Sequence, residues 1–418
     1  MNMSNRLVRG GQVAVLDIGS NKSVCFIADM SPEGKIEIEG VGHMLSKGLR
    51  GGIITDAAEV ETSIVTAVHT AEEMAGVQVE KVFVGLTLPQ IRSRHFAIDL
   101  DLGREPISER DLQDLLGEAA NIVPEGETIL HIMPFRFDLD GQKAIRNPRG
   151  MVGEKLTASL LLVTVPDNLL RNLTHCLGRC HLEVEGFVAS AYASALACLE
   201  EDEKELGVTL LDMGAFTTGY SVFSAGRLVY TGSVGVGSHH ITQDVAQGLS
   251  TSIQQSERLK TVHGGAVVSP ADDAVMVEVY PIGAVNEEEA TMEKRSHLNH
   301  IIRPRVEEVF ELTRDALDAA NLGPAAGNRM VLTGGGSQLL GVAELAHKMF
   351  DKQVRLASPH GFEGLADATS GPAFATPIGM LNYATLMRGS HSWMHAHSHG
   401  TFNGKSFGQI LRWFKENF

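Results

Sequence analysis

The sequence predicts an α/β fold built from two related lobes, because one pattern of strands and loops occurs twice. Each copy has an apolar strand, an Asp-x-Gly loop with hydroxyl residues and a second apolar strand, at 13–28 and at 208–223. This pattern is typical of a β-hairpin whose tight loop joins two buried strands. A third loop supports the prediction. The strand that begins at Met330 ends in Gly334-Gly335-Gly336, and a helical pattern follows over 339–350.

The three loops carry residue types that bind a phosphorylated ligand. Glycine lets the backbone approach an anion closely, and loop N–H groups and Ser or Thr hydroxyls donate to phosphate oxygens. Carboxylates repel phosphate, so Asp17 and Asp212 fit such a site only across a hydrated divalent cation. The three glycines precede a helix, a position suited to a ribose or a phosphate. The loops therefore predict two lobes that close on one nucleotide, with a divalent cation between the aspartates and the phosphates.

The composition is that of an ordinary globular protein of the cytoplasm. The chain has 418 residues, 43% hydrophobic and 21% charged, enough for two lobes of two subdomains each. Its net charge of −16, with no basic tract, argues against nucleic acid as a partner. The N-terminus has no signal-peptide pattern, and no apolar run is long enough to span a bilayer. The four cysteines show no framework of paired spacings, as expected in a reducing compartment.

Two groups of histidines and cysteines invite a metal-site interpretation. One is His175-Cys176 with Cys180-His181, at the end of the predicted helix 168–180, and the other is the histidine-rich segment 391–399. Cysteines on an apolar helix face are better explained as buried packing residues. Histidines in a Gly/Ser-rich segment are better explained as part of a solvated linker. We therefore expect neither group to hold a metal.

Changes of pattern divide the chain into two lobes, an insert and a tail. The first lobe is expected to resume after the insert with the apolar strand Leu160–Val165, and the acidic run 200–205 to be a solvated hinge. The expected parts are a first-lobe core (12–86 and 160–199), an inserted α+β subdomain (88–158), a second-lobe core (207–235 and 330–387), its smaller subdomain (236–329), a flexible tether (388–405) and a terminal helix (406–418).

The terminal segment 406–418 predicts an amphipathic helix. Its large apolar side chains fall within an arc of about 100° on a helix, with Trp413 at the edge. These side chains are Phe407, Ile410, Leu411, Phe414 and Phe418. One interpretation is a helix docked on its own domain. The tether, the aromatic face and the cationic flanks favour binding to membrane lipids instead.

The three loops, in this order, resemble those of the actin-like ATPase superfamily. With the insert and the tail, the chain is similar to the FtsA family of bacterial cell-division proteins. The segments that carry this resemblance are 46–56, 147–151, 202–208, 256–260, 303–308 and 406–418. The resemblance implies an actin-like, ribonuclease H-like duplicated fold. In it the core parts are subdomains 1A and 2A, the smaller part is 2B, and the insert is 1C, on a different side of the molecule from actin's 1B.

The resemblance also implies a function. Members of the family bind ATP, self-associate into filaments attached to the cytoplasmic face of the cell membrane, and recruit FtsZ through its C-terminal peptide. Their insert contributes to self-association and to contacts with later division proteins. We therefore expect an adaptor at the division site that is at most a slow ATPase.

Roles for individual residues follow from the same resemblance. The expected nucleotide-binding residues are Asp17, Gly19, Ser20, Asn21 and Lys22 in the first phosphate loop, Asp212, Gly214, Thr217 and Thr218 in the second, Glu257 and Lys260 near the nucleoside, and Gly334, Gly335, Gly336 and Ser337 in the adenosine loop. Asp17 and Asp212 would face Mg²⁺ through water. Arg303, Arg305 and Glu308 are the expected contacts for the FtsZ peptide.

The second phosphate loop departs from the family pattern. Ala215-Phe216 stand in place of two glycines, and Gly219 stands where an acid often occurs. A phenylalanine obstructs the close backbone approach that glycine allows. Either Phe216 turns away and ATP binds, or nucleotide affinity is weak and the protein works mainly as a scaffold.

Two other classes within the superfamily are alternatives. A small-molecule kinase or phosphatase needs a catalytic carboxylate in the cleft, and an actin-like protein of type IV pilus assembly also binds a peptide. Neither needs a tethered amphipathic tail, so the segment 406–418 favours the cell-division interpretation.

Overall fold

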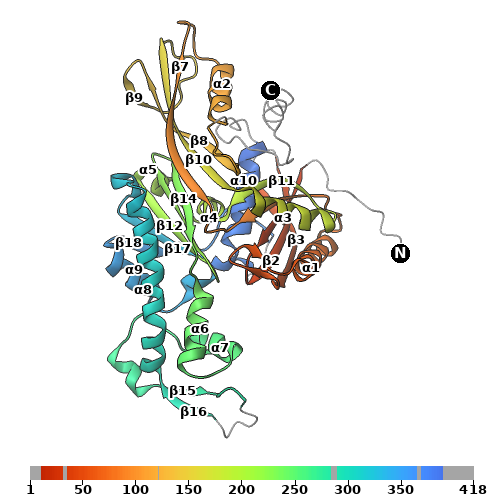
Figure 1. The fold of residues 1–418 in the computed structure, drawn as a ribbon, viewed down its shortest axis with the longest axis vertical. Helices are drawn as coiled ribbons and strands as arrows, with labels where there is room; N and C mark the ends of the chain where they lie inside the picture. Colours follow the sequence, from red (N-terminus) through yellow and green to blue (C-terminus); the bar gives the residue numbers. More distant parts are fainter. Residues whose placement is uncertain (1–10, 32–34, 121, 284–289, 365–368, 389–418) are drawn as a thin grey trace, which may run out of the picture.

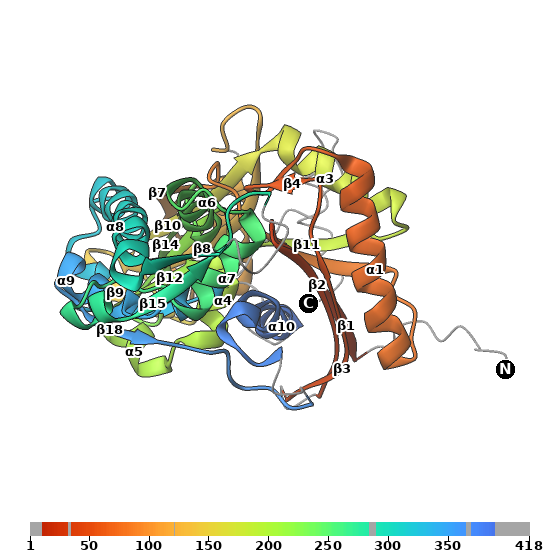
Figure 2. The same ribbon diagram turned by 90° about the horizontal axis from the view of Figure 1, so that it is seen from below.

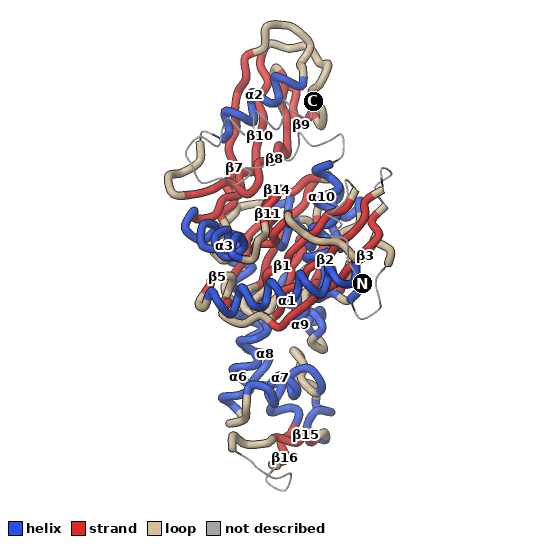
Figure 3. The backbone as a smooth tube through the Cα atoms, turned by 90° about the vertical axis from the view of Figure 1, so that its right-hand side faces the viewer, coloured by secondary structure: helices blue, strands red, loops and turns tan. Residues whose placement is uncertain are grey.

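The computed structural model describes residues 11–31, 35–120, 122–283, 290–364 and 369–388. The predicted terminal helix and the predicted tether beyond Arg388 lie outside these residues. Two five-stranded sheets form the middle of the described structure, with the insert at one end and a mainly helical subdomain at the other (Figures 1 and 3).

The two central sheets have the same topology, which confirms the predicted duplication. Their strand orders are β11-β6-β1-β2-β3 and β14-β13-β12-β17-β18. In each sheet three strands form an antiparallel meander and two more continue in parallel. Asp17 in β1 lies beside Gly85 of β6, and Asp212 in β12 lies beside Thr333 of β17. The two aspartates therefore occupy equivalent positions at the ends of equivalent strands.

Each sheet begins with three strands in succession, and helices precede its later strands along the chain. The first sheet contains β1 (Gln12–Ile18), β2 (Lys22–Met30), β3 (Ile36–Leu45), β6 (Lys81–Leu86) and β11 (Glu183–Ala189). The second contains β12 (Val208–Met213), β13 (Thr218–Ser224), β14 (Arg227–Val234), β17 (Arg329–Thr333) and β18 (Gln353–Leu356). A small hairpin, β4 (Leu49–Arg50) and β5 (Ile53–Ile54), follows β3. The helices outside the insert and the mainly helical subdomain are α1 (Ala57–Ala75), α3 (Asp167–Arg179), α4 (Ser190–Cys198), α5 (Glu201–Leu206), α9 (Val342–Phe350) and α10 (Ala375–Arg388).

Helices α4 and α10 join the lobes. Helix α4 follows the first sheet in sequence but also packs against β12, β13 and β14 of the second, whereas α10 follows the second sheet and packs against β1, β2 and β6. Helices α1 and α10 cover opposite faces of the first sheet (Figure 2). Where α4 and α10 cross, a Cβ on Gly379 would lie 1.7 Å from the carbonyl oxygen of Ala193. Only a glycine permits this approach.

The insert is a four-stranded antiparallel sheet with its own core. Its elements are β7 (Arg92–Asp101), α2 (Glu109–Ala120), β8 (Glu127–Leu139), β9 (Gln142–Ile145) and β10 (Lys155–Pro166). The strand order is β7-β10-β8-β9. The predicted cap of α2 is confirmed, because Ser108 and Asp111 exchange hydrogen bonds between side chain and backbone.

The prediction that Leu160–Val165 returns to the first-lobe sheet is wrong. These residues are part of β10, which pairs with β7 and β8 of the insert. Alternate side chains of this strand face two cores: Leu160 and Leu162 pack in the insert, and Leu161 and Val163 pack in the first lobe. An uninterrupted apolar run therefore arises from burial on both faces rather than from a central strand.

The acidic run 200–205 is likewise not a solvated hinge. Most of it forms the helix α5, in which Glu203 and Lys204 are buried. Glu203 accepts two hydrogen bonds from Arg355 of β18, at 2.7 and 2.5 Å. The ion pair joins α5 to the second sheet, a long-range partner that the local charge pattern cannot reveal.

The mainly helical subdomain lies at the end of the molecule opposite the insert (Figure 1). It contains α6 (Ser238–Gly248), α7 (Ile253–Val262), β15 (Met276–Val279), β16 (Thr291–Lys294) and α8 (Arg295–Ala319). Within the described residues, no helix combines the length and the apolar character needed to cross a bilayer.

Candidate nucleotide-binding site

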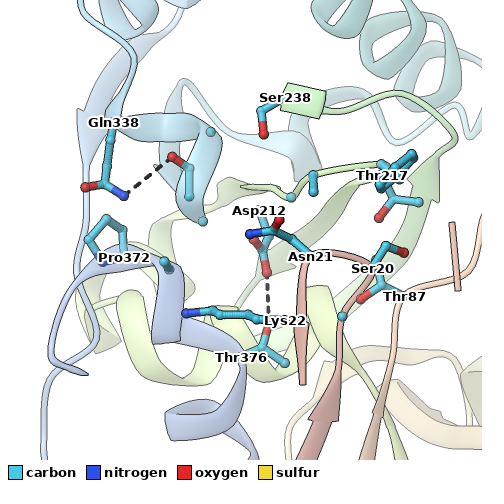
Figure 4. A pocket seen from close by; sticks show the side chains of 18 of the residues that line it. Ser20, Asn21, Lys22, Thr87, Asp212, Thr217, Ser238, Gln338, Pro372 and Thr376 are labelled. Carbon is cyan, nitrogen blue, oxygen red and sulfur yellow. Dashed lines mark hydrogen bonds between the residues drawn. The ribbon is translucent and has the colours of Figure 1, made fainter. Parts of the chain in front are cut away.

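The predicted loops surround one cavity of about 510 Å³ between the lobes (Figure 4). Most of the predicted nucleotide-binding residues line it. They are Asp17, Gly19, Ser20, Asn21, Lys22, Asp212, Gly214, Thr217, Glu257, Lys260, Gly334, Gly335 and Gly336. Residues from both lobes and from the helical subdomain thus meet at a single site.

The two phosphate loops have the same internal geometry. The N–H of Gly19 donates to the carbonyl of Lys22 at 3.1 Å, and the N–H of Gly214 donates to the carbonyl of Thr217 at 3.0 Å. A side chain on either glycine would crowd the carbonyl that it bonds, with a Cβ at 2.9 and 2.8 Å. The N–H groups of Ser20 and Asn21 in the first loop, and of Ala215 and Phe216 in the second, have no hydrogen-bond partner among the described residues. These donors suit an anion.

The two aspartates are surrounded differently. Asp212 accepts hydrogen bonds from Ser194 at 2.6 Å and from Thr376 at 3.1 Å. Burial raises the pKa of Asp212, and these two hydroxyl groups oppose the rise. Burial and then the charge of Asp212 raise the pKa of Asp17 to about 7, against the opposing charge of Lys22. Two neighbouring carboxylates that resist ionisation fit a divalent cation, which would neutralise both.

The cation would be held largely through water. Among the described residues, no group of three or more His, Cys, Asp or Glu side chains is arranged to hold a metal. A pair of carboxylates is the kind of site in which Mg²⁺ keeps several of its waters.

Lys22 lies away from the centre of its loop. Its ammonium group is 3.2 Å from the centroid of the Phe374 ring, in the short 3₁₀ helix Pro372–Phe374. Burial lowers the pKa of Lys22 to about 8, although the charge of Asp17 acts in the opposite direction. The residue thus joins the first loop to the segment that leads into α10.

On the side of the cavity that is expected to face the nucleoside, the buried Lys260 makes three polar contacts. Lys260 donates to Glu257 at 2.8 Å, to Thr242 at 2.9 Å and to the carbonyl of Ser238 at 3.1 Å. Burial acts to raise the pKa of Glu257, but hydrogen bonds from Lys260 and Thr242 outweigh it and lower the pKa. Lys260 therefore positions Glu257 and joins α7 to α6.

Gly334 is the glycine that the adenosine loop requires most strictly. Its φ is +83°, and a Cβ would lie 2.3 Å from a carboxylate oxygen of Asp212. The loop then turns into a short 3₁₀ helix, Gly335–Gln338. The strand-to-helix turn thus brings the backbone against the second phosphate loop.

Two predicted residues do not line the cavity. Thr218 is buried at the start of β13 and donates to the carbonyl of Val236 at 2.9 Å. Ser337 is buried and donates to the carbonyl of Gly334 at 2.8 Å. Both hydroxyls are committed to the shape of their loops, because each donates to a nearby backbone carbonyl.

Several cavity residues were not predicted. Thr376 begins α10, and its pairing with Asp212 depends on the way α10 crosses the lobes. The other cavity residues outside the prediction include Gly52, Thr87, Ser238, Gln338, Pro372, Ala373 and Phe216. The Ala-Thr-Pro-Ile-Gly sequence at 375–379 marks a helix start, but a hydroxyl there carries no signal for a ligand site.

Phe216 lines the cavity and packs against α6. Its ring stacks on His239 with 4.5 Å between the ring centroids. The loop is held to the same helix, because Ser238 and His239 donate their N–H groups to the carbonyls of Gly214 and Ala215. The ring thus lies on the wall formed by the first turn of α6.

The predicted peptide contacts lie on α8 and form ion pairs. Arg305 donates to Asp244 of α6 at 2.6 and 2.9 Å and also pairs with Glu308. The hydrogen bonds with Asp244 raise the pKa of Arg305. Arg303 pairs with Glu307 of its own helix at 2.7 Å and is half exposed. Of the three residues, Arg305 thus has a clear structural role, and Arg303 is the more accessible arginine.

Solved structures establish the class of this fold. A structure of the PilM–PilN type IV pilus biogenesis complex superposes with a TM-score of 0.64 at 14% identity, covering 90% of this chain and 98% of the other. MreB 5 of Spiroplasma citri bound to AMPPNP superposes with a TM-score of 0.55 at 12% identity, covering 91% and 98%. The duplicated lobes and the cleft between them define an actin-like fold.

Sequence comparisons narrow this class. The model of an SHS2 domain inserted in FtsA matches residues 89–164, and that of cell division protein FtsA matches 209–379. The FtsA of Agrobacterium fabrum is 40% identical, covering 97% of this chain and 95% of the relative, and that of Escherichia coli is 30% identical, covering 89% and 90%. The chain belongs to the FtsA family and is a cell-division protein.

Proposed function

We propose that this FtsA-family protein binds ATP with Mg²⁺ in the cleft between its lobes and links FtsZ to the cytoplasmic face of the membrane at the division site. The proposal includes self-association into actin-like filaments and contacts with later division proteins, to which the insert contributes. The observation that carries the nucleotide assignment is the pair of matched loops, whose N–H donors line one cavity with two aspartates.

Each side chain then has a defined task. The loop N–H groups and the hydroxyls of Ser20 and Thr217 bind phosphate oxygens. Ser194 and Thr376 orient Asp212, and Lys260 orients Glu257 toward the nucleoside. Bound Mg²⁺ supplies positive charge between the carboxylates and the phosphates. ATP would thus hold the lobes together, which is how nucleotide binding would favour self-association.

Asp212→Ala should weaken the binding of Mg·ATP at least about tenfold, because it removes one carboxylate of the cation site. Isothermal titration calorimetry of both proteins with Mg·ATP measures this. The matched control is Asp315→Ala, on an exposed position of α8. Equal affinities for Asp212→Ala and the unchanged protein would mean that the second loop does not hold the nucleotide.

The predicted helix 406–418 should anchor the protein to lipid. Burying each of its large apolar side chains contributes about 1.5–3 kcal/mol before ordering costs. Phe414→Asp, or deletion of 406–418, should therefore release the protein from anionic vesicles in a cosedimentation assay. Glu416→Asp, on the polar face, is the matched control and should still sediment. Unchanged sedimentation of the deletion would show that the anchor lies elsewhere.

The same vesicle assay separates anchoring from recruitment. Arg303→Glu should leave the protein on the vesicles but reduce the amount of FtsZ that sediments with it, because an acidic peptide would then face a like charge. Arg314→Glu, an exposed position nearer the other end of α8, is the control. If Arg303→Glu recruits as much FtsZ as the unchanged protein, the peptide contact does not lie on this part of α8.

A further inference from the structure

We propose that Arg50 and Phe216 form a latch between the lobes that slows the release of bound nucleotide, an inference that rests on the proposed function. The guanidinium carbon of Arg50, in the first lobe, lies 5.7 Å from the centroid of the Phe216 ring in the second lobe. This distance is within the range of a cation–π interaction. Phe216 also lines the cavity, so the contact lies at the edge of the nucleotide site.

The backbone that carries Arg50 is held firmly by the first lobe, whereas the residue itself is exposed. It belongs to the β4–β5 hairpin, whose Leu49 is buried in the first-lobe core. The N–H of Gly52 donates to the hydroxyl of Ser20 in the first phosphate loop at 3.3 Å. Gly52 also lies so close to the end of β6 that a Cβ would be 2.5 Å from the carbonyl oxygen of Thr87. The hairpin therefore moves with the first lobe.

Phe216 is held just as firmly by the second lobe. Its ring stacks on His239, and the carbonyl of Ala215 accepts a hydrogen bond of 2.7 Å from the N–H of His239. A side chain on Gly237 would clash with the carbonyl oxygens of Gly214 and Ala215 at 2.6 and 2.7 Å. The second loop and the start of α6 thus form one packed unit.

The charges at the contact favour the pairing. Burial and then the charge of Lys260 lower the pKa of His239, which disfavours a positive charge on the imidazole beside Arg50. The ring against which the guanidinium of Arg50 lies is that of Phe216, which stacks on His239. Phe216, which departs from the family pattern of the loop, contacts Arg50 through its ring. A glycine at this position could not make that contact.

The consequence concerns the rate of nucleotide exchange. Nucleotide leaves a cleft of this kind when the lobes separate, and separation must break the contact between Arg50 and Phe216. Because the contact is lost on opening, its removal should raise the dissociation rate more than the association rate. A single exposed cation–π contact corresponds to a change of about two- to fivefold in that rate.

Stopped-flow release of a fluorescent ATP analogue, chased with excess Mg·ATP, tests the latch on the full chain. Phe216→Leu keeps an apolar side chain but removes the aromatic face, and Arg50→Ala removes the cation. Each should accelerate release about two- to fivefold. Arg110→Ala, an exposed arginine on α2 of the insert, is the matched control and should leave release unaltered.

The double variant Phe216→Leu/Arg50→Ala decides whether the two residues act together. If they form one contact, the double variant releases nucleotide no faster than either single variant. The latch would be overturned if the accelerations of the two single variants multiplied in the double variant, or if neither single variant changed the release rate. Either result would leave nucleotide binding intact. Failure of the unchanged protein to bind the analogue would overturn the proposed nucleotide function, and the latch with it. A folding defect would instead show as a lower melting temperature without ligand.

Discussion

Gly379→Ala is expected to lower the free energy of unfolding by about 3 kcal/mol, at the upper end of the cost of overpacking. The added Cβ would lie 1.7 Å from the carbonyl oxygen of Ala193 and 2.2 Å from its carbonyl carbon. Both are backbone atoms, so α4 and α10 must move apart rather than change a rotamer. Urea denaturation without nucleotide, followed by circular dichroism, measures the loss.

Gly178→Ala is the matched control for this prediction. Gly178 also lies in a helix, α3, but a Cβ there would meet nothing within 4 Å. Alanine should then stabilise the helix by about 0.5–1 kcal/mol through propensity alone. If Gly379→Ala is as stable as the unchanged protein, the two helices do not pack as closely as the structure has them.

Gly379→Ala should also affect the nucleotide site. Ser194 of α4 and Thr376 of α10 both donate to Asp212, and Gly379 lies one turn after Thr376. Separation of the helices would pull these hydroxyls away from the carboxylate. Weaker binding of Mg·ATP by the folded fraction of Gly379→Ala would support this connection.

Asp17→Asn is expected to stabilise the protein without ligand while weakening nucleotide binding. The pKa of Asp17 is raised from 3.8 to about 7, first by burial and then by the charge of Asp212. Between these two pH values the folded state keeps a proton that the unfolded chain loses, so stability falls as pH rises. The full cost is present above pH 7. A difference of this size corresponds to about 4 kcal/mol, which solvent in the cavity reduces to about 2–4.

Thermal denaturation in EDTA at two pH values measures this effect. Asparagine has no charge to desolvate, so the gain from Asp17→Asn should be largest at pH 8 and less than half as large at pH 5. Asp212→Asn should gain less, because Ser194 and Thr376 already stabilise that carboxylate. A gain that does not change with pH would mean that ionisation of Asp17 is not its source. Binding of Mg·ATP should fall at least about tenfold in Asp17→Asn.

The two lobes and their loops could be predicted because their signals are local. A hairpin with a glycine at the turn needs only neighbouring residues, and its apolar strands show alternation and length in the sequence itself. The second copy at 208–223 then implied a second lobe. For the same reason the cap of α2, formed by Ser108 and Asp111, could be predicted from the sequence.

Signals that depend on distant partners were misread. The run 200–205 looked solvated because the partner of Glu203 is Arg355, more than a hundred residues later. Leu160–Val165 looked like a central strand because its two buried faces belong to two different cores. Thr218 was expected in the second phosphate loop and Ser337 in the adenosine loop, and in the structure each hydroxyl bonds a nearby carbonyl.

The sequence by itself determined the duplicated α/β lobes, the three loops and the residue types that face a phosphorylated ligand. It did so because turn chemistry and strand periodicity act over a few residues. Only the tertiary structure decided which hydroxyls hold Asp212, where the ring of Phe216 lies and how Arg50 meets it. Those contacts join residues far apart in the chain, and they exist only once α4 and α10 have set the distance between the lobes.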